Sequence, residues 1–469
     1  MPVRWPALPV ARSGDTRSGA RSGHGYCFNE RHCFSPTGLS GPGNYPPSAL
    51  ARQLFERGPG RRRNAAGRRA GGALRRHSGR VERKGAALTH PTPRVVVTGL
   101  GLRGPGVASP DELWALLQNP VPPPPARVRS YPQSGDVLGY AVDDVPGPSD
   151  SRLERLALAA FDDASADAGL TAEALTFAGI SFGTTHGRID LFESSADEQA
   201  RAEPLYSIGE ALARLHGCYG PIQLYSTACS ASLTAIGMAA EVLRDGRAEV
   251  MIVGGAEIFS DVAMASFTRL GGLDPERCRP FHQERQGAVF GEGAAFLILE
   301  TEEHALARRA PRPPYCTIEG FGWSCDAHHA TAPEPSGRAL RLAACDALAR
   351  AGLTSAHIDC VIPHGTGTRL NDEAEAHLLR DLIAGERPSV PVLPLKAFIG
   401  HGAGAAGVFG CIAAALICRH QWVPSANCAR PEYPLNFGGQ AAGEGKIGHV
   451  LVNAYAFGGN NASLILGSA

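Results

Sequence analysis

Two stretches of small residues, each behind a short apolar segment, constrain the fold of this chain most strongly. The first, Ser230–Arg244, follows the strand-like Pro221–Tyr225. The second, Gly402–Arg419, follows Pro394–Phe398, which we also interpret as a strand. Both stretches begin with Ala, Gly and Ser and carry larger apolar residues later. Because the same strand-then-helix pattern occurs twice, the sequence predicts an α/β fold built from two related halves.

Further apolar segments fit the same architecture. Helices are predicted at Pro110–Gln118, which Ser109 caps, and at Ser151–Ala168. The glycines of Gly99-Leu100-Gly101 predict a turn that ends the first strand. The alternation favours a largely parallel sheet, with an active site where the strand ends of both halves meet. The predicted strands are Val95–Thr98, Gly179–Phe182, Val250–Gly254, Phe296–Glu300, Cys360–Pro363, His449–Asn453 and Ala462–Leu466.

The first 93 residues differ from the rest. They carry 16 Arg and one Lys against four acidic residues, and they show no helical or strand period. We expect this Arg-rich leader to be disordered, as a transit peptide or as a segment translated from a misplaced start. Nucleic-acid binding is not expected, since the leader lacks interleaved aromatic residues and any binding-fold signature.

Cysteine spacing and hydropathy exclude other classes of protein. The 12 cysteines form no C-x-x-C pair, which argues against a zinc site or a disulfide framework. No uninterrupted apolar run reaches the roughly 18 residues that a membrane span needs. We therefore expect a cytoplasmic protein without a membrane span.

Cys229 lies at the corner between a predicted strand and the first small-residue helix, in the run Thr-Ala-Cys-Ser. A helix N-terminus favours a thiolate through its dipole and its free N–H groups. The same N–H groups can hold the oxyanion that forms on an acylated sulfur. The corner therefore predicts a nucleophile with a lowered pKa.

Two histidines extend this hypothesis. His364 follows a predicted strand in Pro-His-Gly-Thr-Gly-Thr, with carboxylates close behind at Asp372 and Glu375. A lone loop histidine is more often structural or merely exposed, but a neighbouring carboxylate can set the tautomer of this one. His401 precedes the second small-residue helix, whose first residues have the alternative interpretation of a close-packed helix start. Lys396 is one of only three lysines in an Arg-rich chain, and its presence in this motif predicts a specific role.

Together these motifs resemble those of the β-ketoacyl synthases, the thiolase-fold condensing enzymes of fatty acid and polyketide assembly. Thr-Ala-Cys-Ser at Cys229 resembles the nucleophile motif, and His-Gly-Thr-Gly-Thr at His364 resembles the first histidine motif. Leu-Lys-Ala-Phe-Ile-Gly-His, ending at His401, resembles the second. Asn453-Ala-Tyr-Ala-Phe-Gly-Gly resembles the C-terminal glycine loop. The resemblance extends from Val95 to about Leu466.

The resemblance implies a layered α-β-α-β-α fold of thiolase type. Residues 94–310 would form the half with the nucleophile, and residues 311–469 the half with both histidine motifs. It implies no metal and no organic cofactor. The expected partner is an acyl carrier protein bearing acyl and malonyl thioesters. A homodimer, or a heterodimer with a related subunit, is expected.

The resemblance also assigns roles. An acyl group passes from the carrier to Cys229, and His364 and His401 bind the thioester oxygen of the malonyl group as it loses CO2. Lys396 and Glu375, with Asp372 nearby, would orient the histidines. Backbone N–H groups of Cys229 and Phe457 would form the oxyanion hole. Phe457, followed by Gly458, would also be the gate between the two half-reactions.

Two other functions remain open from the sequence. One is an acyltransferase or decarboxylase on the same fold that does not elongate a chain. The other is a non-catalytic partner subunit that shapes the chain-length tunnel. Such partners usually lack the nucleophilic cysteine, whereas Cys229 is present here. The acyl chain length and the choice between fatty acid and polyketide pathways do not follow from the sequence.

Overall fold

The structure is a computed structural model that describes residues 92–119, 121–131, 135–147, 149–194, 204–385, 387–426, 428–438, 440–441 and 446–469. These residues belong to one compact unit, Ala87–Ala469. The predicted leader, residues 1–93, lies outside the described residues except for its last two positions, so its disorder stays a prediction.

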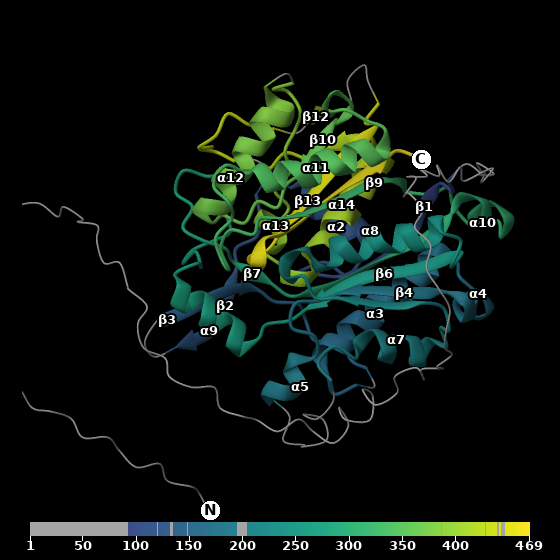
Figure 1. Cartoon of the computed structure of the whole chain (residues 1–469). Helices are drawn as coiled ribbons and strands as arrows, with labels where there is room; N and C mark the ends of the chain where they lie inside the picture. Colours follow the sequence, from purple (N-terminus) through teal and green to yellow (C-terminus); the bar gives the residue numbers. More distant parts are fainter. Residues whose placement is uncertain are drawn as a thin grey trace, which may run out of the picture. The chain divides into compact units, whose positions relative to one another are not determined.

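Strands and helices alternate along the described chain (Figure 1). The strands are β1 (Val95–Arg103), β2 (Ala126–Tyr131), β3 (Gly135–Tyr140), β4 (Gly179–Gly183), β5 (Ile222–Tyr225), β6 (Val250–Glu257), β7 (Phe290–Gly291), β8 (Gly293–Thr301), β9 (Cys316–Cys325), β10 (Cys360–Ile362), β11 (Trp422–Val423), β12 (Gln440–Ala441), β13 (His449–Tyr455) and β14 (Asn460–Gly467). The α-helices are α2 (Pro110–Gln118), α3 (Arg152–Ala168), α4 (Ala172–Phe177), α5 (Ile189–Ser194), α7 (Ile208–His216), α8 (Ala231–Arg244), α9 (Asp261–Leu270), α10 (Glu302–Ala307), α11 (Arg338–Ala351), α12 (Arg369–Leu379), α13 (Lys396–Ile399) and α14 (Ala406–His420). Short 3₁₀ and π turns are η1 (Ala228–Ser230), η2 (Ser355–His357), η3 (Arg380–Ala384), η4 (Ala403–Ala405) and η5 (Phe457–Gly459).

The main sheet runs in the order β10-β13-β14-β9-β1-β8-β6-β4-β5. Its two ends repeat one pattern. In the first half β4 pairs in parallel with β6, and β8 lies antiparallel between β6 and β1. In the second half β10 pairs in parallel with β13, and β14 lies antiparallel between β13 and β9. The two related halves that the sequence predicts are therefore present in the topology.

The expectation of a largely parallel sheet is wrong, because the sheet is mixed. β1 lies antiparallel to both β8 and β9, and β13 lies antiparallel to β14. The short turn η5 joins β13 directly to β14, and a connection that short can only join antiparallel neighbours.

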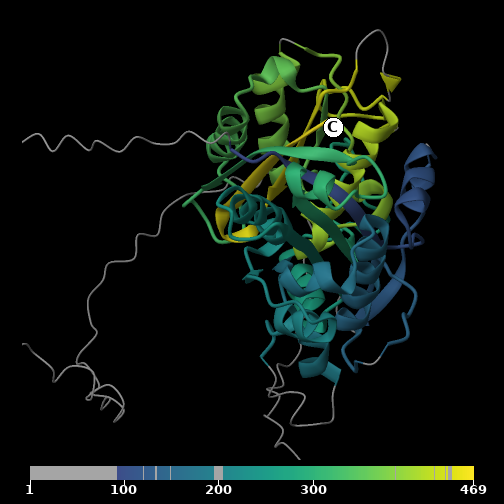
Figure 2. The ribbon, with the colours of Figure 1, turned by 90° about the vertical axis from the view of Figure 1, so that its right-hand side faces the viewer.

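Helices separate and cover the strands in layers (Figures 1 and 2). α3 packs on β1 and β8, and α11 packs on β9 and β14. Between the two halves, α8 packs on β4 and β6 while α14 packs on β13, and the two helices contact each other. The predicted layered α/β fold is confirmed, and its two middle helices are the small-residue stretches of the sequence.

The predicted glycine turn after Val95–Thr98 is also wrong, because β1 continues through it to Arg103. A Cβ on Gly99 would lie 2.4 Å from the Ala164 carbonyl oxygen of α3, and one on Gly101 would lie 2.1 Å from that of Ala160. These glycines therefore let α3 approach the strand closely.

The predicted strand Pro394–Phe398 is wrong as well. The strand-like pairing comes earlier, where the Val361 N–H donates to Pro391 O and the Leu393 N–H donates to Val361 O, each at 2.9 Å. The chain then turns into α13, whose first residue is Lys396. This turn brings the lysine side chain into the interior.

One described segment, Ala403–His420, has the length and composition of a membrane span, but 83% of it is buried in the protein. It is the core helix α14 with its preceding turn, and its apolar surface is covered by the neighbouring layers. The proposed boundary between the halves, at residues 310 and 311, falls between α10 and β9 and stays a prediction.

Candidate active site

Cys229 lies in η1, the tight turn between β5 and α8. The residue before it, Ala228, has a φ of +50°, which an L-residue with a side chain seldom adopts. This strained corner leaves Cys229 9% exposed. The predicted strand-to-helix position of the sulfur is therefore observed, and the backbone strain is concentrated there.

The predicted lowering of the thiol pKa is not observed. Burial raises the pKa of Cys229 to about 11, while the charge of Lys396 and the backbone groups of Cys229 and Phe457 lower it by less. Desolvation of the thiolate raises the pKa more than the backbone groups at the helix start lower it. At neutral pH the free protein therefore holds a protonated thiol at this corner.

His364 follows β10 and is 3% exposed. Lys396 donates from Nζ to the His364 carbonyl oxygen, and the same Nζ lies 3.3 Å from His364 Nδ1. A protonated lysine can only donate, so Nδ1 of the ring accepts and the hydrogen of the ring lies on Nε2. Burial and the charge of Lys396 hold the pKa of His364 well below its usual value. The ring is therefore a neutral donor through Nε2.

Glu375 supports the backbone of this loop from α12. Its carboxylate accepts the N–H groups of His364 and Gly365, each at 2.8 Å. Asn453 Nδ2 donates to it at 3.3 Å from β13. Burial raises the pKa of Glu375 to about 7, against these hydrogen bonds and the charge of Lys396. Lys396 and Glu375 thus both lie at His364, but the carboxylate binds the backbone of the loop and not the ring, so the predicted control of the tautomer by a carboxylate is not seen.

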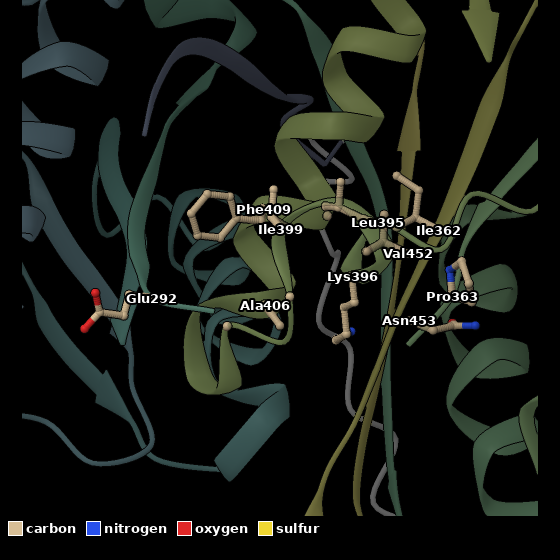
Figure 3. Close-up of a pocket in the computed structure, with 13 residues that line it drawn as sticks. Glu292, Ile362, Pro363, Leu395, Lys396, Ile399, Ala406, Phe409, Val452 and Asn453 are labelled. Carbon is tan, nitrogen blue, oxygen red and sulfur yellow. The ribbon is translucent and has the colours of Figure 1, made fainter. Parts of the chain in front are cut away.

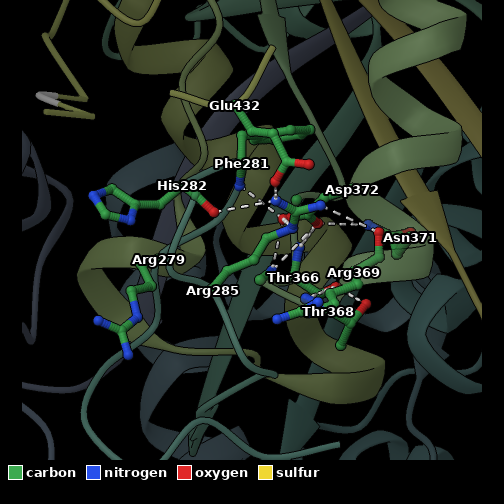
Figure 4. A network of polar contacts seen from close by, with 12 residues as sticks. Arg279, Phe281, His282, Arg285, Thr366, Thr368, Arg369, Asn371, Asp372 and Glu432 are labelled. Carbon is green, nitrogen blue, oxygen red and sulfur yellow. Dashed lines mark hydrogen bonds and ion pairs between the residues drawn. The ribbon is translucent and has the colours of Figure 1, made fainter. Parts of the chain in front are cut away.

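Asp372, which is fully buried, ties the same loop to the segment before β7 (Figure 4). Its carboxylate accepts the N–H groups of Thr366 at 3.0 Å and of Phe281 at 2.7 Å. Arg285 Nε lies 3.6 Å from it, and the other end of that guanidinium binds Glu432. Asp372 thus has a structural role, since it fixes the loop without reaching the cavity.

His401 lies on the loop before η4 and is 3% exposed. Its backbone N–H donates to Val289 O at 2.8 Å, and its ring stacks on Phe290 at 5.4 Å. The rings of His401 and His364 lie 5.3 Å apart and nearly perpendicular. Burial and the charge of Lys396 hold the pKa of His401 well below its usual value. Both histidines are therefore neutral and adjacent.

Phe457 begins the turn η5 and is 39% exposed. Its backbone lies close enough to the Cys229 sulfur to lower the pKa of the thiol slightly. Gly458 has a φ of +82°, a conformation that favours glycine and that turns the chain directly behind Phe457. The backbone groups of Cys229 and Phe457 thus both lie near the sulfur, and their role as an oxyanion hole stays a prediction.

A cavity of about 460 Å³ joins these residues, with Cys229, His364, His401, Phe457 and Gly458 in its walls. Lys396, Glu375 and Asp372 stand behind the walls. Two further wall residues were missed by sequence reasoning. The ring centres of Tyr455 and His364 lie 5.8 Å apart. The ring of Phe267, from α9, stacks on that of Phe457 with their centres 5.2 Å apart. Phe267 has no sequence signal that separates it from a core residue, whereas Tyr455 lies in the glycine-loop motif but was given no role.

A much smaller void of about 20 Å³ lies behind Lys396, with Pro363, Asn453 and Ala406 among its walls (Figure 3). That volume suits one water molecule and no substrate. The chemistry therefore belongs to the larger cavity.

Among the described residues, no group of three or more His, Cys, Asp or Glu side chains could hold a metal ion. The cavity instead offers a thiol, two neutral imidazoles and convergent backbone donors. Such a set suits acyl transfer to sulfur and stabilisation of a developing oxyanion or enolate.

Family models place the chain among known proteins. Residues 149–305 match the β-ketoacyl synthase N-terminal domain, and residues 315–428 match its C-terminal domain. The chain belongs to the β-ketoacyl synthase family. The predicted family, acyltransferase class and condensing activity are thereby confirmed. The two matched segments carry Cys229 and both histidines, respectively.

Curated relatives cover most of the chain. A putative polyketide β-ketoacyl synthase 1 of Streptomyces halstedii is 32% identical over 413 residues, or 80% of this chain and 97% of that protein. The 3-oxoacyl-[acyl-carrier-protein] synthase 2 of Rhizobium meliloti is also 32% identical, over 80% of this chain and 98% of its own. Both polyketide and fatty acid synthases are thus similar at the same level, so similarity does not select the pathway.

Solved structures agree with the fold. The ishigamide ketosynthase/chain length factor matches with a TM-score of 0.71 at 30% identity, covering 81% of this chain and all of that one. A β-ketoacyl synthase from Burkholderia phymatum matches with the same TM-score at 28% identity.

Proposed function

We propose that Cys229, His364 and His401 carry out the decarboxylative Claisen condensation of an acyl group with malonyl carrier protein. The observation that carries this proposal is their convergence on one buried cavity, together with backbone donors at the sulfur. Lys396 and Glu375 support them from behind the walls, and Gly458 turns the chain next to Phe457 in the wall.

In the first half-reaction Cys229 attacks the acyl thioester and the carrier thiol leaves. The Cys229 proton passes to that thiol, since burial keeps the free cysteine protonated. The backbone N–H groups of Cys229 and Phe457 bind the oxyanion while the tetrahedral intermediate exists. Neither histidine needs to be charged for this step.

In the second half-reaction the malonyl thioester loses CO2 and leaves an enolate. His364 donates to the enolate oxygen from Nε2, and His401 provides the second donor. The enolate carbon attacks the acyl carbon on Cys229, forms the new C–C bond and releases the cysteine. The exposure of Phe457 at the cavity and its stacking on Phe267 support the proposal that it is a gate between the two steps.

An acyl carrier protein is the proposed partner. Among similar solved structures is a type II polyketide synthase acyl-carrier protein in complex with its ketosynthase, at 25% identity and a TM-score of 0.71. A carrier arm can enter a cavity of this size and deliver either thioester. A cytoplasmic location remains part of this proposal.

A dimer is also proposed, either with a second copy or with a related subunit. β5 forms the outer edge of the main sheet in the described part of the chain, and its Ile222 is 44% exposed. A free strand edge with an apolar residue favours pairing with another chain. One similar structure is a ketosynthase in complex with its chain length factor.

The test is an assay of the purified protein with a series of acyl carriers plus malonyl carrier, with products identified by mass. A product two carbons longer than the acyl group supports elongation and reports the preferred chain length. CO2 release without a longer product would support the decarboxylase alternative, and no reaction would support the non-catalytic subunit. Cys229→Ala is the control, and it should form no elongated product.

A further inference from the structure

Glu257, the last residue of β6, is a buried carboxylate with no role in the steps above. It is 3% exposed and accepts hydrogen bonds from two loops. From the loop after β4 it accepts the N–H of Thr185 at 2.7 Å and that of His186 at 3.2 Å. From η4 it accepts the N–H of Gly404 at 3.0 Å. The residue therefore joins the strand ends of the first half to the loop that carries His401.

The contact with η4 is tight. A Cβ on Gly404 would lie 2.5 Å from the backbone N of Thr185, so no side chain fits between the two loops. Ala403, between His401 and Gly404, has a strained φ of +40°. At the other end of this loop, the backbone of His401 forms hydrogen bonds with Val289 and Gly291. Glu257 thus supplies the second anchor of a strained loop.

His186 completes the arrangement. Its Nδ1 lies 3.2 Å from Glu257 Oε1, and its side chain is 28% exposed. Burial opposes protonation of this ring, but the hydrogen bond and charge of Glu257, with a smaller contribution from Glu193, raise the pKa of His186. The ring therefore contacts the carboxylate and helps to hold it in place.

Glu257 also acts on Cys229 through its charge. It raises the pKa of the thiol, whereas Lys396 lowers it. Two opposite charges thus lie within electrostatic reach of the proposed nucleophile, one from each half of the molecule.

We propose that Glu257, with His186, is a positioning residue of the condensing centre that holds the His401 loop against the loop after β4. This inference rests on the proposed function of His401. It adds a third buried carboxylate, after Glu375 and Asp372, that fixes a loop carrying a histidine.

Glu257→Gln tests the proposal, because the side chain keeps its size but loses its charge and one acceptor. Two readouts should move in opposite directions. CO2 release from malonyl carrier should fall about 10- to 100-fold, since a displaced histidine loses its alignment. Alkylation of Cys229 by iodoacetamide at about pH 8 should become about threefold faster, since a negative charge near the thiol is gone. Because partial unfolding would also slow CO2 release and expose the buried thiol to alkylation, both rates are compared only in protein whose melting temperature shows that it is folded.

Two further variants separate the effect of the loop position from the effect of removing a buried charge. Gly404→Ala pushes η4 away from Thr185 while the carboxylate stays, so CO2 release should fall and the alkylation rate should not rise. Glu300→Gln is the matched control. Glu300 is also fully buried, but it pairs with Val250 at the opposite end of the β6 and β8 ladder. It should lower the melting temperature and leave both readouts unchanged.

Folded Glu257→Gln protein that releases CO2 at the normal rate would overturn the proposal, whatever its alkylation rate. If Glu257→Gln does not fold, Gly404→Ala decides, and normal CO2 release from that variant overturns it. If the unmodified protein releases no CO2, the proposed function fails. The position of the His401 loop in a structure of Glu257→Gln then decides, and an unmoved loop overturns the inference.

Discussion

Lys396 Nζ lies 3.3 Å from His364 Nδ1, and this contact sets the tautomer of the histidine. Because Nδ1 accepts, the hydrogen on Nε2 is free to be donated. His364 and His401 both have pKa values well below the usual one, so neither ring needs a second proton to act. This arrangement supports the proposal that neutral donors stabilise the enolate.

Lys396→Met should remove this control of the tautomer. We expect CO2 release from malonyl carrier to fall about 10- to 100-fold, as is typical when a group that orients an active residue is lost. Acylation of Cys229, measured by mass in a single turnover, should fall less. Lys446→Met is the control, because Lys446 is exposed and should leave both steps intact. Equal loss of both steps in Lys396→Met would contradict the assignment.

The pH dependence of the malonyl step should report Glu375. This carboxyl has a pKa of about 7, so it is neutral below that pH and ionised above it. Only the ionised form accepts the N–H groups of His364 and Gly365 with both oxygens. CO2 release should therefore rise with pH through about 7. Glu375→Gln should be slow and should lack this rise; a rise that persists in the variant would assign it to another group.

The acidity of Cys229 gives a third prediction. A thiol whose pKa is about 11 holds little thiolate at neutral pH. Iodoacetamide should therefore modify Cys229 about 100-fold more slowly than the exposed Cys325 at about pH 8. Peptide mass mapping after timed alkylation measures both rates. Faster modification of Cys229 would mean that the helix start outweighs burial.

Motif order identified the centre from sequence, and local patterning placed most of its elements. Ser109 and Ser151 cap the predicted helices, with side chains that accept the N–H groups of Glu112 and Glu154. Cys229 and His364 were placed correctly at strand ends. These features depend on near neighbours in the chain, which explains why they could be predicted.

Long-range contacts decided the features that were missed. Gly99 and Gly101 are typical of a turn when the sequence is read alone, but in the structure they let α3 pack closely on the strand. Lys396 contacts His364, which lies 32 residues away in the chain, and the acidity of Cys229 depends on how much protein covers it. No local pattern carries such information.

The predicted leader can be tested by truncation. A chain that begins at Arg94 retains β1 and every residue of the centre. It should fold and keep the condensing activity of the full chain, as measured by the melting temperature and the product assay. Loss of activity in a soluble truncated chain would give residues 1–93 a part in function.

The most direct test of the centre compares His364→Ala and His401→Ala in two measurements on the same samples. Single-turnover acylation measures the half-reaction at Cys229. Release of labelled CO2 from malonyl carrier measures the half-reaction that depends on the histidines. We predict near-normal acyl-enzyme on Cys229 and a loss of CO2 release of about 100- to 1000-fold in each variant. Normal CO2 release from either variant, or an acyl group on any cysteine other than Cys229, would contradict the account.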